Sequence, residues 1–104
     1  MIAAIKKMLG LGPEVNYAEL VKNGALIIDV RSKSEYQSGH IKGSVNIPLD
    51  QLSSSTKLPQ NKEKAIITCC ASGMRSASGK SILKSKGYTE VHNGGGWYGL
   101  NNKL

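Results

Sequence analysis

Two continuous apolar runs constrain the fold of this chain more than any other feature. The sequence ALIIDV covers residues 25–30, and the sequence KAIITC covers residues 64–69. Apolar runs without alternation are typical of strands that are buried on both faces, as in a parallel sheet covered by helices. Shorter segments over 44–48 and 89–93 predict two further strands. The sequence therefore predicts a buried sheet.

Helical segments separate these strands. Segments 16–24 and 32–39 each begin at capping-box spacing and end at a glycine, which predicts two short helices. A longer helix is expected over 76–87, although Gly79 weakens it by about 1 kcal/mol relative to alanine. Residues 49–52 predict one helical turn. Alternating strands and helices predict an α/β fold in which ligands bind at the carboxyl ends of the strands. The inward face of the long helix is expected to hold Ala77, Ile82 and Leu83.

The chain length and the cysteines indicate one domain in a reducing compartment. With 104 residues the chain can form a single core, and we predict an N-terminal extension over 1–14 and a domain over 15–104. The two cysteines are adjacent and cannot join distant segments. Lys6 and Lys7 interrupt the N-terminal apolar patch before it reaches the length of a signal sequence or a membrane span. We therefore predict a cytoplasmic protein with no integral membrane segment.

The net charge of +7 indicates that the protein attracts anions. The lysines are scattered along the chain, and no basic stripe with interleaved aromatic residues occurs. Such a stripe is typical of nucleic-acid-binding proteins, so we predict no nucleic-acid partner. A small anionic substrate fits the charge. A solvated lysine surface that only keeps the protein soluble fits it as well.

A cysteine stands where the second buried run ends. The sequence CASGMR, residues 70–75, connects this run to the long helix. If the segment curls around the Cys70 sulfur, its backbone N–H groups form an anion-binding nest, which the positive end of the helix strengthens. Such a nest lowers the pKa of a cysteine from about 8.5 to roughly 3.5–7.5, so that the thiolate is a nucleophile at neutral pH. Gly73 permits the tight turn, and Arg75 adds a fixed positive charge suited to an oxyanion.

Four segments together resemble the single-domain rhodaneses, a family of sulfurtransferases: 27–48, 70–76, 83–91 and 93–97. The resemblance implies a rhodanese-like three-layer α/β fold with a central five-stranded parallel sheet flanked by helices. It also implies that Cys70 takes a sulfane sulfur from a small anionic donor such as thiosulfate, or from a persulfide, and passes it to cyanide, a thiol or a protein acceptor. No metal and no cofactor are implied. The persulfide on Cys70 would be bound by the loop residues Ala71, Ser72, Gly73, Met74 and Arg75.

Two alternatives to sulfur transfer remain open. Counted from Cys69 instead of Cys70, the loop has the C-x5-R spacing of tyrosine and dual-specificity phosphatases and some arsenate reductases. However, Thr68 occupies the position where that pattern usually has histidine. The second alternative is a non-catalytic module that carries a persulfide for a partner or binds a protein. Arg75 is the only positive residue of the loop, which leaves the choice of sulfur donor open.

Several other residues have both a structural and a functional interpretation. Cys69 is expected to be a buried core thiol on the opposite face of its strand from Cys70. Trp97 is expected to pack in the core. The two cysteines and two separated histidines do not form a zinc-site pattern. A structural network of ion pairs and caps is expected among Asp29, Arg31, Glu35 and His40. One helical face, suited to packing or to a partner, is shared by Ile2, Ile5, Met8 and Leu9.

Overall fold

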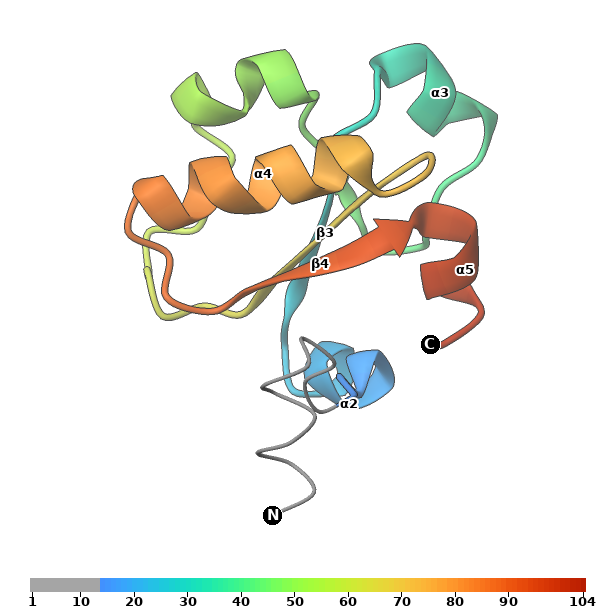
Figure 1. Ribbon diagram of the computed structural model, residues 1–104, viewed down its shortest axis with the longest axis horizontal. Coiled ribbons are helices and arrows are strands. Elements are labelled where there is room, and N and C mark those ends of the chain that lie inside the picture. Colours follow the sequence, from blue (N-terminus) through green and yellow to red (C-terminus); the bar gives the residue numbers. More distant parts are fainter. Residues whose placement is uncertain (1–13) are drawn as a thin grey trace.

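The computed structural model describes residues 14–104, which form a sheet with helices on both sides (Figure 1). The strands are β1 (Leu26–Asp29), β2 (Val45–Asn46), β3 (Ile66–Cys70) and β4 (Val91–Gly96). The helices are α2 (Tyr17–Lys22), α3 (Lys33–Ser38), α4 (Met74–Ser85), α5 (Trp97–Asn101) and the 3-10 helix η1 (Leu49–Ser54). Within 14–104, no helix is both long enough and apolar enough to cross a membrane.

The predicted N-terminal extension over 1–14 lies almost entirely outside the described residues. The apolar helical face shared by Ile2, Ile5, Met8 and Leu9 lies outside them completely. The boundary between extension and domain therefore stays a prediction.

The strands pair in the order β2-β1-β3-β4, and all of them run parallel. Along β1, Ile28 pairs with Val45 on one side and with Thr68 on the other. Because the strands are parallel, their carboxyl ends meet at one edge of the sheet. Asp29 and Cys70 are the last residues of β1 and β3, so both lie at this edge.

The five strands implied by the family resemblance are wrong for the part of the chain that the structure describes. Its sheet has four strands, and they correspond to the four segments expected from the residue pattern. The remaining segments carry turns or helices, since the polar connection over 55–65 is mostly irregular and the chain turns directly from β4 into α5. The α/β fold with a parallel sheet flanked by helices is confirmed.

Each face of the sheet buries its own apolar cluster. On one face, Ile28 and Ile66 pack under α4 and η1. On the other face, Ile27 and Ile67 pack against α2 and α5. Neighbouring residues of one strand thus serve opposite clusters, because side chains alternate along a strand. This double burial explains why the two long runs are apolar without alternation.

Helix α4 begins two residues earlier than predicted and turns a different face to the sheet. Its fully buried residues are Ser76, Gly79 and Leu83, whereas Ala77 is exposed, so the expected inward position of Ala77 is wrong. A Cβ atom at Gly79 would lie 3.3 Å from Cγ1 of Val30. The glycine that weakens the helix therefore also lets the helix pack closely on the sheet.

Candidate active site

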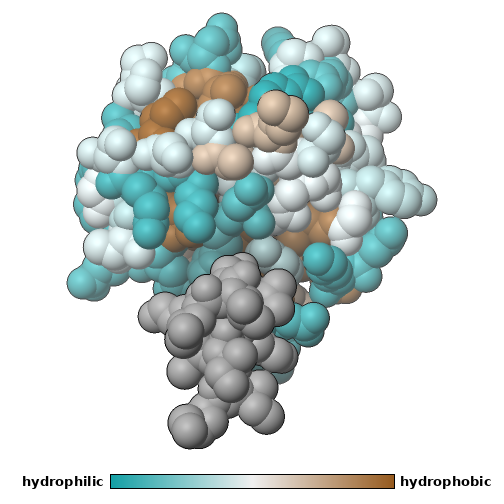
Figure 2. Space-filling model, in the orientation of Figure 1, coloured by the Kyte–Doolittle hydropathy of each residue, from teal (hydrophilic) through white to brown (hydrophobic). Residues whose placement is uncertain are grey.

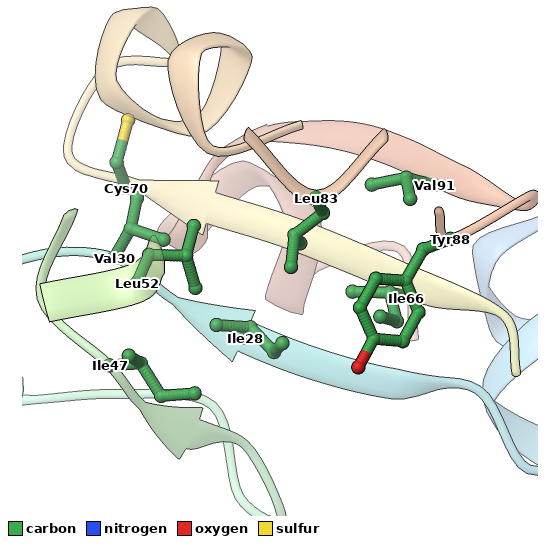
Figure 3. Close-up of a cluster of buried hydrophobic side chains, with 9 residues drawn as sticks. All are labelled: Ile28, Val30, Ile47, Leu52, Ile66, Cys70, Leu83, Tyr88 and Val91. Carbon is green, nitrogen blue, oxygen red and sulfur yellow. The ribbon is translucent and has the colours of Figure 1, made fainter. Parts of the chain in front are cut away.

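Cys70 lies at the end of β3, where the apolar cluster meets the loop that follows the strand. Only 1% of the surface of Cys70 is exposed to solvent. Figure 3 shows its sulfur pointing away from Val30 and Leu52 and toward the coil that follows the strand. The strand supplies a rigid base for the thiol, and the loop supplies its polar surroundings.

The loop between β3 and α4 is short and turns around the sulfur. Gly73 has a φ of 107°, in the left-handed region that favours glycine. In this conformation its backbone N–H donates to Sγ of Cys70 at 2.9 Å. Gly73 is also the N-cap of the 12-residue helix α4, so the sulfur lies near the positive end of a helix dipole.

These donors lower the pKa of the Cys70 thiol. Burial alone raises the pKa, because it disfavours the charged form. The backbone N–H groups of Ser76 and Gly73, the Ser76 hydroxyl and the Ser72 N–H all act in the opposite direction, and together they outweigh burial. The geometry of the nest therefore favours the thiolate.

Ser76 is a site residue that the sequence analysis did not single out. It is completely buried. Its hydroxyl lies 3.0 Å from the Gly73 carbonyl and 2.5 Å from Oδ1 of Asn93, and the same Oδ1 accepts the Gly95 N–H at 2.9 Å. These bonds fasten the loop to β4. The sequence signal for Ser76 is its place one residue after Arg75, inside the segment 70–76 that carries the family resemblance.

Arg75 forms an ion pair with Glu35. Its two Nη atoms donate to the Glu35 carboxylate at 2.7 and 2.8 Å. The Arg75 hydrogen bonds are the main reason why the pKa of Glu35 falls to about 2, and the Ser32 backbone N–H adds to the effect. Glu35 thus cancels most of the only positive charge that the loop contributes. The ion pair joins the loop to α3.

The expected polar network is confirmed in part. The Arg31 guanidinium donates to the Asp29 carboxylate at 2.8–3.0 Å, and both residues are buried. Arg31 also donates to the carbonyl of Glu35, while the Glu35 side chain bonds Arg75 and caps α3. His40 lies outside this network, because its ring stacks on Tyr36 and its Nδ1 lies 2.7 Å from the Tyr36 carbonyl.

Cys69 faces the opposite cluster, as expected from the alternation of side chains along a strand. It is 0% exposed and packs with Ile67 and Leu100. Burial, followed by the nearby charge of Asp29, raises the pKa of its thiol to about 12. Cys69 thus faces away from the loop, which disfavours the C-x5-R alternative that needs Cys69 as the nucleophile.

Comparisons with known proteins identify the family of this chain. The model of the rhodanese-like domain family matches residues 13–103. The chain belongs to the rhodanese-like domain family. Thiosulfate sulfurtransferase PspE of Escherichia coli is 39% identical over 71 residues, which cover 66% of this chain and 67% of PspE.

Solved structures of the family superpose well on this rhodanese-like domain. A rhodanese with anions from E. coli aligns with a TM-score of 0.68 and 36% identity, over 73% of this chain and 91% of that one. The reduced CoADR-RHD of Bacillus anthracis aligns with a TM-score of 0.72 and 37% identity, over 98% of this chain and 18% of that one. The latter relative is therefore much longer than this chain.

Two glycines of β4 allow close packing in this rhodanese-like domain, Gly96 against the loop and Gly94 against β3 and α5. A Cβ atom on Gly96 would lie 2.9 Å from the Ala71 carbonyl oxygen, and a Cβ atom on Gly94 would lie 2.8–2.9 Å from Ile67, Leu100 and the backbone of Thr68. The pairing of β3 and β4 is irregular at this point.

The predicted loop residues occupy different environments. Ser72 and Gly73 present N–H groups that act on Cys70, whereas Ala71 packs its carbonyl against Gly96. Met74 is 82% exposed.

Trp97 is partly buried against the Cys69 cluster, as expected, and the Arg31 guanidinium lies 4.8 Å from its ring centroid. Within residues 14–104, no group of three His, Cys, Asp or Glu residues forms a possible metal site.

Proposed function

We propose that this rhodanese-like domain is a sulfurtransferase in which Cys70 is the nucleophile and carries the sulfur as a persulfide. The main support is the 2.9 Å hydrogen bond from the Gly73 N–H to Sγ, in a setting that lowers the pKa of the thiol. The thiolate is the reactive form of cysteine. The similarity to a protein named as a thiosulfate sulfurtransferase agrees with this activity.

In the first step, the Cys70 thiolate attacks the sulfane sulfur of the donor. A bond forms between Sγ and this sulfur, the S–S bond of the donor breaks, and its electron pair leaves on the departing group. With thiosulfate the departing group is sulfite. Cys70 then carries a persulfide with a negative outer sulfur. The backbone N–H groups of Ser72 and Gly73 act on the Cys70 sulfur and are suited to stabilise this charge.

In the second step, a thiophilic acceptor takes the outer sulfur. Cyanide leaves as thiocyanate, and a thiol, free or in a protein, leaves as a persulfide. The Sγ–S bond breaks and returns its electron pair to Cys70 as a thiolate. Neither step needs a metal or an organic cofactor for its balance. A reducing compartment such as the cytoplasm suits the cycle, because it keeps the free thiol available.

The test measures thiocyanate formation from thiosulfate and cyanide in wild type, Cys70→Ser and Cys69→Ala. We expect Cys70→Ser to lower the rate at least about 1000-fold, because the covalent step loses its nucleophile. Cys69→Ala should stay within about threefold of wild type, since this thiol only packs in the core. Melting curves show whether each variant is folded.

Mass spectrometry after incubation with a donor provides a second measurement. We expect the mass of one sulfur atom to be added at Cys70 and removed by cyanide. Equal rates in folded wild type and folded Cys70→Ser would refute the proposal. A stable persulfide on Cys70 that no small acceptor removes would instead favour a sulfur carrier for a protein partner.

A further inference from the structure

A hollow of about 340 Å³ lies against the Cys70 loop. It meets the loop at Arg75 and meets the apolar cluster that contains Cys70 at Val30. Cys70 itself does not line the hollow, so the hollow is suited to hold the part of a donor molecule that extends beyond the sulfane sulfur. Its lining consists of Val30, Ser32, Pro48, Leu49, Asp50 and Arg75.

The charges at this hollow are unfavourable for a dianion. Arg75 is the only cation of the lining, and its two Nη atoms are bonded to Glu35. Asp50 is exposed and adds a carboxylate. Because Arg75 is paired with Glu35, the negative charge of Asp50 has no unpaired counter-charge among the lining residues. Lys33 and Lys57 line a neighbouring hollow of about 630 Å³ instead.

The remaining surface favours an apolar group. Val30, Pro48 and Leu49 give the lining three apolar side chains. Met74, the first residue of α4, is 82% exposed. Figure 2 shows a mostly hydrophilic molecular face interrupted by brown, apolar areas, the largest of them near the top of the view, where η1 and α4 lie in Figure 1. Apolar surface that stays in contact with water gains free energy when a ligand covers it.

We propose that the preferred donor is an organic sulfane compound with at most one negative charge and an apolar group beside the sulfane sulfur, rather than thiosulfate. This inference rests on the proposed function of Cys70. A dianion is repelled more strongly than a monoanion by the Cys70 thiolate and by Asp50, and Arg75, the cation of the lining, is already paired with Glu35. A monoanion with an apolar group meets less repulsion and can cover Val30, Pro48 and Leu49.

An organic thiosulfonate has this chemistry. The Cys70 thiolate attacks its sulfane sulfur, so that the Sγ–S bond forms and the S–S bond to the sulfonyl group breaks. The electron pair leaves on an organic sulfinate, as it leaves on sulfite in the case of thiosulfate. Two negative charges are present before the step and two after it, on the persulfide and the sulfinate. The reaction therefore needs no oxidant or reductant.

The experiment compares thiosulfate, methanethiosulfonate and benzenethiosulfonate as donors to wild type, with cyanide as the common acceptor and thiocyanate as the product. All three contain the same sulfane sulfur, and they differ in charge and in apolar size. We expect kcat/KM for benzenethiosulfonate to exceed that for thiosulfate by about tenfold or more, since one charge is removed and a ring is buried. Methanethiosulfonate should fall between the two.

Asp50→Asn tests the cause of the preference. Because the Coulomb energy is proportional to the charge of the donor, the variant should raise kcat/KM about threefold for thiosulfate but only about 1.7-fold for either thiosulfonate. Salt should reduce both gains. Glu63→Gln is the matched control, since it changes the net charge equally but lies in the segment before β3, at the opposite edge of the sheet. Glu63→Gln should leave the ratio of kcat/KM between thiosulfonate and thiosulfate unchanged.

The outcomes separate this inference from the proposed function. Preference for the thiosulfonates, reduced by Asp50→Asn and not by Glu63→Gln, supports the inference. Equal or better use of thiosulfate by wild type, with a persulfide on Cys70, overturns the inference and leaves the sulfurtransferase function intact. If Asp50→Asn and Glu63→Gln change the ratio of kcat/KM between thiosulfonate and thiosulfate equally, the inference is overturned as well. If no donor places a sulfur on Cys70, the proposed function itself is wrong.

Discussion

Cys69 and Cys70 are neighbours on β3, yet their environments are opposite. Cys69 lies in an apolar cluster, where burial raises its pKa to about 12. Cys70 is almost equally buried, but the loop beside it supplies hydrogen-bond donors that lower its pKa. Solvent exposure of the residue therefore does not by itself decide the ionisation of these thiols. At Cys70, hydrogen bonds from the loop and from α4 outweigh burial, whereas no hydrogen bond opposes burial at Cys69.

The two faces also differ in how they are built. The Cys69 face is filled by side chains of α2 and α5 that contribute no donor to the thiol. The Cys70 face ends at the N-terminus of α4, whose first backbone groups have no partner inside the helix. One strand can therefore combine a core thiol and a reactive thiol, because its alternation sends them to different surroundings.

The largest expected difference between the two thiols is their rate of alkylation. At neutral pH, a thiol with a pKa of about 12 is ionised to a fraction on the order of 10⁻⁵. We expect iodoacetamide to modify Cys70 at least about 100-fold faster than Cys69 in the native protein, since the thiolate is the nucleophile. Peptide-resolved mass spectrometry over time measures both rates.

Denatured protein provides the control for this comparison. In denaturant the two rates should approach each other, because both thiols then have ordinary pKa values. Faster modification of Cys69 than of Cys70 in the native protein would contradict the assignment of the two faces.

The second expected effect concerns the packing between β4 and the Cys69 face. In Gly94→Ala the new Cβ atom would lie 2.8–2.9 Å from Leu100 and Ile67, so part of this cluster must shift. We expect a loss of about 2–3 kcal/mol in the free energy of unfolding, as for other overpacked cores. Chemical denaturation measures it. Gly99→Ala is the matched control, because nothing lies within 4 Å of a Cβ atom there; an equal loss in both variants would refute the packing argument.

Much of this architecture can be predicted from the residues alone. The two apolar runs and the two shorter segments specify the four strands of the described residues, and the capping pairs and glycine stops specify α2 and α3, since these signals are local. The fifth strand came only from the family resemblance, and the sheet of the described residues lacks it. The inward face of α4 was wrong at Ala77, because the packing of Ser76 and Gly79 depends on Val30 and Asn93, which are distant in sequence.

The candidate site was predictable to a similar degree. Cys70 and Gly73 follow from a strand, a tight turn and a helix in succession. The partner of Arg75 did not follow, since Glu35 lies 40 positions away and was assigned to a network with Arg31. The structure changes the role expected for Arg75, from a free cation beside the sulfur to one half of an ion pair.

A smaller effect is expected at Ser76, whose hydroxyl helps to lower the pKa of Cys70 below that of Cys69. Ser76→Ala removes the hydroxyl while the backbone N–H groups remain, so the pKa of Cys70 should rise. The pH dependence of Cys70 alkylation measures the shift, and it should move by the same amount in the pH profile of sulfur transfer. Ser78→Ala, one turn away from the loop and exposed, is the control. An unchanged Cys70 profile in folded Ser76→Ala would mean that the backbone alone sets the pKa.

The smallest expected effect is the contribution of the Arg75–Glu35 ion pair to stability in acid. The pKa of Glu35 is about 2 in the folded protein and 4.5 as an ordinary glutamate. Between these values the unfolded chain binds more protons, so stability rises with pH. The contribution is fully present above pH 4.5 and is lost as the pH falls toward 2. Because both side chains are more than one third exposed, solvent and salt weaken it. Melting temperatures of wild type and Glu35→Gln should therefore converge as the pH falls through this window, and a constant difference would show that Glu35 stabilises the fold by packing or capping rather than by its charge.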